Sequence, residues 1–193
     1  MLDKDVKYTV SQRKECNFGG FRVLIADDFR FMNDLLSGML REVGVGSIIS
    51  CEGAIEAQNY LKDAAKNPSA ATHVDLALID WLMPGMDGVE LIKWIRSSKS
   101  EELKLMPIIL VSAYTSRKVV EAARDSGANE ALVKPISADR LISRIVHMIN
   151  NQRPFVKAPE FFGPDRRRQI QDFDGDEKRK METQFVKVNR ENG

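Results

Sequence analysis

Three apolar segments of this chain each end at a charged side chain. The segment FRVLIADD ends at Asp27 and Asp28, DLALID ends at Asp80, and EALVK ends at Lys134. Apolar runs that stop at a charge are typical of buried parallel strands, whose carboxyl ends meet at one ligand-binding edge of a sheet. Carboxylates gathered there could hold a hard divalent cation, and a lysine could pair with a phosphoryl oxygen. The residue types therefore predict magnesium-assisted phosphoryl transfer.

The elements that must position these residues alternate along the chain. Hydrophobic patterning predicts strands at 21–26, 47–50, 74–79, 107–111 and 131–133, and helices at 29–43, 53–66, 88–98, 116–126 and 137–150. Ser137 has the side chain and position of an N-cap for the last helix. Strands that alternate with helices indicate an α/β fold with a doubly wound, five-stranded parallel sheet.

Composition divides the chain into three parts. Residues 1–20 are polar and are expected to form a short extension, 21–150 form the α/β domain, and 151–193 form a tail. Pro154, Pro159 and Pro164 recur in the tail, which excludes a continuing helix. The tail is polar, so we expect it to be extended and to lack a core of its own.

Bulk properties exclude several classes of protein. An apolar fraction of 43% in 193 residues is sufficient for a packed core, and a formal charge of +1 does not favour DNA binding. Cys16 and Cys51 form neither a disulfide framework nor a metal-knuckle spacing. No apolar run approaches the roughly 18 residues of a membrane span, and the first twenty residues lack a signal peptide. These properties predict a cytoplasmic protein.

Over residues 21–150 the sequence resembles a response-regulator receiver domain, the CheY-like phospho-acceptor module of two-component signalling. The resemblance rests on four motifs in order along the chain: Asp27-Asp28, Asp80 with Met83-Pro84 after it, Ser112-Ala113, and Lys134-Pro135. It implies a flavodoxin-like fold and phosphorylation by a histidine kinase or phosphotransfer protein. It also implies output through contact with a downstream protein target, rather than catalysis on a separate substrate.

The resemblance implies a role for each residue at the predicted edge. Asp80 is the nucleophile that accepts the phosphoryl group, Lys134 pairs with a phosphoryl oxygen, and the hydroxyl of Ser112 hydrogen-bonds another. A cis bond at Pro135 aims Lys134. Magnesium is held by a set of oxygen ligands that comprises Asp27, Asp28, Asp80 and the main-chain carbonyl of Leu82.

One other class of protein was considered, and the sequence departs from the family pattern at one position. A phosphatase of the haloacid-dehalogenase type needs a second aspartate two residues after its nucleophile, and Leu82 occupies that position. Many receivers carry an aromatic residue three positions before the lysine, where this chain has Ala131. The aromatic switch of those receivers is therefore absent here or is supplied by another residue, for which Tyr114 is a candidate.

The tail contains a second motif that could bind a ligand. The run Gly163-Pro-Asp-Arg-Arg-Arg168 resembles the arginine-rich tail of CheY-like cyclic-di-GMP effectors of the flagellar and surface-attachment systems. Arg166, Arg167 and Arg168 could stack on bases or pair with phosphates, and Asp165 could accept from the guanine edge. The alternatives are a solvated tail with a chance basic cluster, or a basic arm for an acidic partner. A nucleotide-sensing module with the receiver as scaffold is thus the alternative function.

Overall fold

Five parallel strands form the central sheet of the protein, in the order β2-β1-β3-β4-β5. The structure is a computed structural model and describes residues 18–69, 71–114, 117–158, 161–165 and 184–186. The strands are β1 Arg22–Ala26, β2 Ser47–Cys51, β3 Leu76–Asp80, β4 Ile108–Ser112 and β5 Glu130–Val133. Each pair of neighbours is parallel, which confirms the predicted doubly wound sheet.

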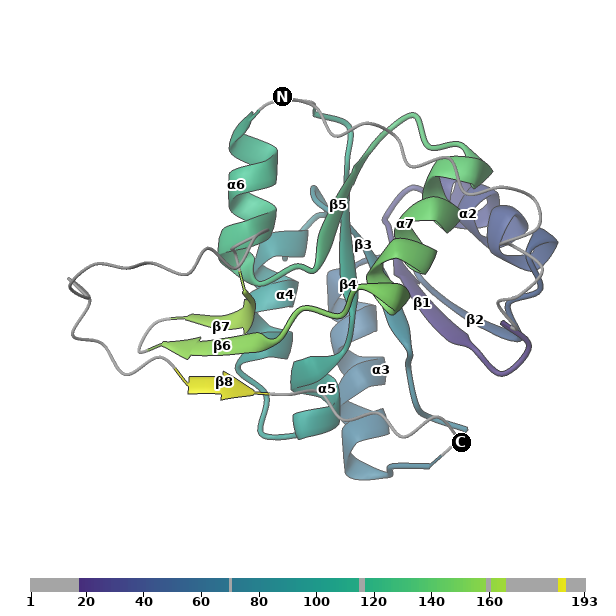
Figure 1. Cartoon of the computed structure of the whole chain (residues 1–193). Coiled ribbons are helices and arrows are strands. Elements are labelled where there is room, and N and C mark those ends of the chain that lie inside the picture. Colours follow the sequence, from purple (N-terminus) through teal and green to yellow (C-terminus); the bar gives the residue numbers. More distant parts are fainter. Residues whose placement is uncertain (1–17, 70, 115–116, 159–160, 166–183, 187–193) are drawn as a thin grey trace.

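Helices cover both faces of the sheet (Figure 1). The helices α2 Arg30–Glu42 and α7 Ala138–Asn150 pack on one face, and α3 Ala54–Lys66, α4 Gly88–Arg96 and α6 Arg117–Ser126 pack on the other. Alternation along β1 shows why both faces need a cover: Val23 and Ile25 enter one core, and Leu24 and Ala26 enter the other. The short helix α5, Glu101–Leu105, was not predicted, because five residues are too few to show a helical period.

Local signals define the ends of two helices near the predicted site. Asp87 caps α4 by accepting a hydrogen bond from the Glu90 N–H, and the Glu90 side chain accepts one from the Asp87 N–H in return. Ser137 accepts from the Arg140 N–H and caps α7, as predicted from the sequence. These caps determine where the chain turns from a strand end into the following helix.

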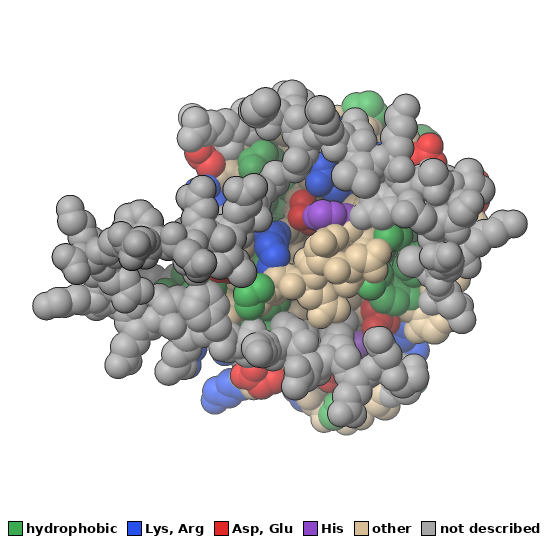
Figure 2. All heavy atoms as spheres, in the orientation of Figure 1, with side chains coloured by type: hydrophobic (Ala, Val, Ile, Leu, Met, Phe, Trp, Pro, Cys, Tyr) green, Lys and Arg blue, Asp and Glu red, His purple; other side chains and the backbone are tan. Residues whose placement is uncertain are grey.

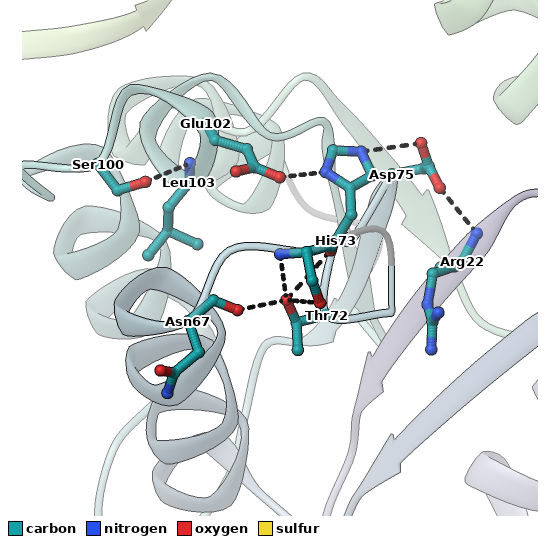
Figure 3. A network of polar contacts seen from close by, with 9 residues as sticks. Arg22, Asn67, Thr72, His73, Asp75, Ser100, Glu102 and Leu103 are labelled. Atoms are coloured by element: carbon teal, nitrogen blue, oxygen red, sulfur yellow. Dashed lines mark hydrogen bonds and ion pairs between the residues drawn. The ribbon is translucent and has the colours of Figure 1, made fainter. Parts of the chain in front are cut away.

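A polar network joins elements at the amino edge of the sheet (Figure 3). The ring of His73 lies between two carboxylates, with Nδ1 against Glu102 of α5 and Nε2 3.1 Å from Asp75 Oδ1. Asp75 also accepts a hydrogen bond from the Arg22 N–H at the start of β1, at 2.9 Å. The network therefore ties α5 to the beginnings of β1 and β3.

The tail contains a second, antiparallel sheet that the sequence did not predict. Its strands are β6 Phe155–Ala158, β7 Phe161–Pro164 and β8 Gln184–Val186, in the order β7-β6-β8. Figure 1 shows the sheet beside α4, α5 and α6. Phe155 is buried in this position. The tail thus obtains a core from the surface of the α/β domain, a contact that tail composition alone does not reveal.

The beginning of the domain also differs from the prediction. Phe18, assigned from the sequence to the extension 1–20, is buried in the core beside Val45, and its carbonyl accepts hydrogen bonds from Phe21 and Gly46. On the face drawn in Figure 2, the coloured acidic and basic side chains lie interspersed. Among the described helices, none has both the length and the apolar character needed to cross a membrane.

Candidate phosphoryl-transfer site

Strand register brings the predicted site residues to one edge of the sheet. Ala26 pairs with Ile79, so Asp27, directly after β1, comes beside Asp80, the last residue of β3. Asp80 pairs with Val111, and Ser112 in turn pairs with Val133. Lys134 therefore comes one residue beyond the last pair of the sheet, facing the acidic strand ends.

Three carboxylates form a compact acidic cluster at this edge. One oxygen from each of Asp27, Asp28 and Asp80 lies within 4.8 Å of the others. Asp27 and Asp80 are buried, whereas Asp28 is exposed and forms the open side of the cluster. Three carboxylate oxygen ligands with access to solvent suit Mg²⁺, which retains several of its waters when bound to proteins.

The ammonium group of Lys134 bridges two members of the cluster. Its Nζ atom lies 2.8 Å from Asp27 Oδ2 and 2.6 Å from Asp80 Oδ1. Burial by itself lowers the pKa of Lys134, but the two carboxylates outweigh burial and raise that pKa. The Lys134–Pro135 peptide bond is cis, as expected. Three carboxylates and one ammonium group leave a net charge of −2, which a divalent cation would neutralise.

Asp80 is held in a defined orientation. One carboxylate oxygen contacts Lys134, and the other accepts a hydrogen bond from the Leu82 N–H at 3.0 Å. Burial raises the pKa of Asp80, and the nearby charge of Asp27 acts in the same direction, whereas Lys134 and the Leu82 N–H oppose the increase. The negative charge on this carboxylate is therefore less stable than it would be in water, and shifted pKa values of this kind are enriched at functional sites.

Asn33 supports the cluster and was missed by the sequence reasoning. Its side-chain Nδ2 donates to the main-chain carbonyl of Asp27 at 2.6 Å and to that of Cys51 at 3.3 Å. The Asp27 carboxylate also accepts from the Phe29 N–H at 2.9 Å, which orients it from the other side. A polar residue in the buried stripe of the helix 29–43 was the available signal, because such residues need internal partners.

Ser112 lies at the predicted edge and is almost fully buried. Its hydroxyl oxygen accepts a hydrogen bond from the Tyr114 N–H at 3.0 Å, and its carbonyl accepts one from the Lys134 N–H at 2.7 Å. The side chains of Leu82 and Tyr114 are exposed at the same edge. The proposed use of the Leu82 carbonyl as a metal ligand stays a prediction.

Asp165 is the one predicted nucleotide-binding residue within the described part of the chain, and it does not lie at this cluster. Asp165 follows β7, where its N–H donates to the Pro154 carbonyl at 2.8 Å and its own carbonyl accepts from Arg153 at 3.3 Å. Arg153 also contacts Asn129, near the amino end of β5. Asp165 therefore belongs to the edge opposite the acidic cluster, and 166–168 fall outside the described residues.

Comparisons with known proteins agree with this geometry. The response regulator receiver domain family matches residues 23–146. The chemotaxis protein CheY-3 of Vibrio cholerae serotype O1 is 32% identical over 124 residues, or 64% of this chain and 88% of that protein. In a CheX–CheY–BeF3–Mg2+ complex from Borrelia burgdorferi, a matching chain shares 25% identity at a TM-score of 0.58, over 68% of this chain and 90% of that chain.

One solved structure is longer than this chain. It is a probable two-component response regulator/GGDEF domain protein, which matches 72% of this chain with 26% identity and a TM-score of 0.59. The alignment covers 53% of that protein, so this chain spans about half of its length.

Proposed function

The chain belongs to the response regulator receiver domain family, and we propose that Asp80 is its phospho-acceptor. A histidine kinase or phosphotransfer protein would supply the phosphoryl group, and the phosphorylated protein would act through contact with a downstream target in the cytoplasm. The observation that supports this function most directly is the cluster of three carboxylates within 4.8 Å, with Lys134 in contact with two of them.

The arrangement supports nucleophilic attack by Asp80. An oxygen of its carboxylate would form a bond to phosphorus while the bond from phosphorus to the donor nitrogen breaks, and the electron pair leaves with the histidine. A bound Mg²⁺, held by Asp27, Asp28 and Asp80, would neutralise charge on the phosphoryl oxygens. Lys134, already 2.6 Å from Asp80, would pair with one of those oxygens, and the Ser112 hydroxyl would donate to another.

The surface around the cluster supports docking of a phosphodonor protein. Phe29, Leu82 and Tyr114 come from three different loops at this edge, and their exposed fractions are 60%, 52% and 56%. Large apolar side chains exposed together around a site are typical of protein contact surfaces. We propose that a donor protein covers them when it presents its phosphohistidine.

Labelling with acetyl phosphate and Mg²⁺ tests the acceptor. Asp80→Asn should abolish labelling, because the amide cannot form the acyl phosphate. Asp34→Asn is the matched control, since Asp34 is exposed on α2 outside the cluster and should label like the native chain. Undiminished labelling of the Asp80 variant would place the acceptor elsewhere and overturn the assignment.

Binding of cyclic di-GMP by the tail is the second candidate function. The observation that favours it is the anchoring of Asp165, whose backbone N–H and carbonyl both form hydrogen bonds immediately before the arginine run. Calorimetric titration of the full chain should show binding of the guanine dinucleotide, and Asp165→Ala should reduce the preference over cyclic di-AMP. Equal, weak and salt-sensitive binding of both dinucleotides would instead indicate a general basic arm.

A further inference from the structure

A buried arginine joins several segments at the edge of the sheet opposite the acidic cluster. Arg96, at the end of α4, is 3% exposed. Its Nε donates to the carbonyl of Gly127, and its terminal nitrogens donate to the carbonyls of Lys104 and Met106 and to Asn129 Oδ1, all at 2.8 to 2.9 Å. The guanidinium thus connects the end of α4 to the chain that enters β4 and to the turn that enters β5.

The tail sheet covers this guanidinium. The ring of Phe155 in β6 lies 5.1 Å from Arg96 Cζ, and the Phe155 side chain is itself buried. Cation–π contacts of this kind stabilise more when water is excluded. Burial lowers the pKa of Arg96 to about 9, so the group remains charged at neutral pH.

Further contacts hold the tail sheet against the same surface. Arg153 donates to the Asn129 carbonyl and lies 3.7 Å from Glu130 Oε1. The backbones of β7 and the turn before β5 touch without side chains between them: a Cβ on Gly163 would lie 2.8 Å from the Cα of Gly127. The tail sheet is therefore fitted to the end of α4 and the start of β5.

These two elements also form part of the phosphoryl site at their other ends. Gly88, the first residue of α4, lies so close to Asp80 that a Cβ there would be 2.0 Å from the Asp80 carbonyl oxygen. The strand β5 runs from Glu130, which contacts Arg153, to Val133, and Lys134 follows directly. One helix and one strand thus each have one end at the tail contact and the other at the acidic cluster.

We propose that the tail sheet is an intramolecular partner of the receiver, docked through Phe155 and Gly163, and that docking strengthens phosphoryl binding at Asp80. This linkage rests on the proposed function. Docking restricts the motion of the start of β5 and the end of α4. The loss of conformational entropy when Lys134 and Asp80 bind a phosphoryl group is therefore smaller. Linkage is reciprocal, so binding of a phosphoryl group should in turn strengthen docking of the tail.

Beryllium fluoride with Mg²⁺, used as a phosphoryl mimic on the full chain, tests the linkage. Phe155→Ala removes the ring over Arg96, and Gly163→Val forces β7 away from Gly127. Lys157→Ala is the matched control, because Lys157 is exposed on the same strand. Tryptophan fluorescence reports mimic affinity, and hydrogen exchange of 155–158 and 161–163 reports docking.

We expect both tail variants to lose exchange protection over 155–158 and 161–163 and to bind the mimic about five- to tenfold more weakly, within the usual range of coupling between sites. Lys157→Ala should match the native chain in both measurements. Equal mimic affinity after loss of protection would overturn the linkage and leave the proposed function intact. Retained protection in both variants would overturn the docking contacts, and a native chain that binds no mimic would overturn both proposals.

Discussion

Two buried or half-buried cations at opposite edges of the sheet have very different surroundings. Lys134 faces the carboxylates of Asp27 and Asp80, which raise its pKa against the effect of burial. Arg96 faces main-chain carbonyls, the amide oxygen of Asn129 and the ring of Phe155, and burial lowers its pKa. Lys134 is therefore surrounded by more negative than positive charge, whereas Arg96 is surrounded by neutral hydrogen-bond acceptors.

This difference indicates that the surroundings of Lys134 form a binding site and that Arg96 has a structural role. The acidic cluster keeps a net charge of −2 and an exposed member, Asp28, so it can gain stability by binding a cation and a phosphoryl group. The guanidinium of Arg96 donates four hydrogen bonds to acceptors of the same chain and is buried from solvent. Changes at Arg96 should therefore affect stability, and changes at the cluster should affect ligand binding.

The largest expected effect is on stability, from Arg96→Met. The variant removes the donor to three carbonyls in a buried place and leaves Asn129 Oδ1 with only the Ile108 N–H, so we expect the free energy of unfolding to fall by about 3–5 kcal/mol. Lys93→Met, an exposed position on the same helix, should change it by less than about 0.5 kcal/mol. Urea unfolding measures both, and similar values for the two variants would contradict the structural role of Arg96.

Gly88→Ala should affect both the stability of the domain and the acidic cluster, because Gly88 lies directly against Asp80. The added Cβ would lie 2.0 Å from the Asp80 carbonyl oxygen, so the helix must shift, at a cost of about 1–3 kcal/mol in unfolding free energy. Labelling of Asp80 by acetyl phosphate should fall as well. Gly38→Ala in α2 is the matched control: a Cβ there meets nothing within 4 Å, and stability should stay equal or rise. Normal labelling of the Gly88 variant would show that a shift of α4 does not disturb Asp80.

Asp28→Ala should weaken Mg²⁺ binding while leaving the fold unchanged. Losing one charge-assisted oxygen contact corresponds to about a tenfold or greater loss of affinity. Titration of Mg²⁺ followed by tryptophan fluorescence measures this loss, with Asp34→Ala as the control on the same side of the domain. If the two variants bind Mg²⁺ equally well, Asp28 is not a ligand.

The smallest expected effect is a gain in stability from Asp80→Asn. Because burial raises the folded-state pKa of Asp80 above its ordinary 3.8, the folded chain holds this proton more tightly than the unfolded chain. The contribution of this group to stability therefore falls as pH rises from 3.8 through the folded pKa, and the charge is a cost at neutral pH. The urea midpoint of Asp80→Asn should exceed the native midpoint at pH 7 and approach it at about pH 4. A lower midpoint at pH 7 would show that the ion pair with Lys134 outweighs burial.

Sequence patterns were sufficient to predict the α/β class, the cap at Ser137 and the strand ends that bear the site residues Asp27, Asp80, Ser112 and Lys134. These features depend on local signals: apolar runs, helical periods and polar residues at the ends of elements. Parallel pairing then brings the carboxyl ends of strands to one edge whatever the details of packing. Functional residues at the ends of parallel strands can therefore be predicted from the sequence alone.

The contacts between individual side chains could not be predicted in this way, because they depend on how distant segments pack. Lys134 contacts Asp27 from 107 positions away in the sequence, and Asn33 supports a carbonyl that it reaches only through the packing of α2 on the sheet. Arg96 lies in the buried stripe of α4, and three of its four acceptors are main-chain carbonyls, which every residue type possesses and no sequence pattern marks. The tail sheet could not be predicted for the same reason. Phe155 and Gly163 belong to strands that pack against a surface assembled from distant segments. The polar composition of the tail does not indicate a core to which another part of the chain contributes.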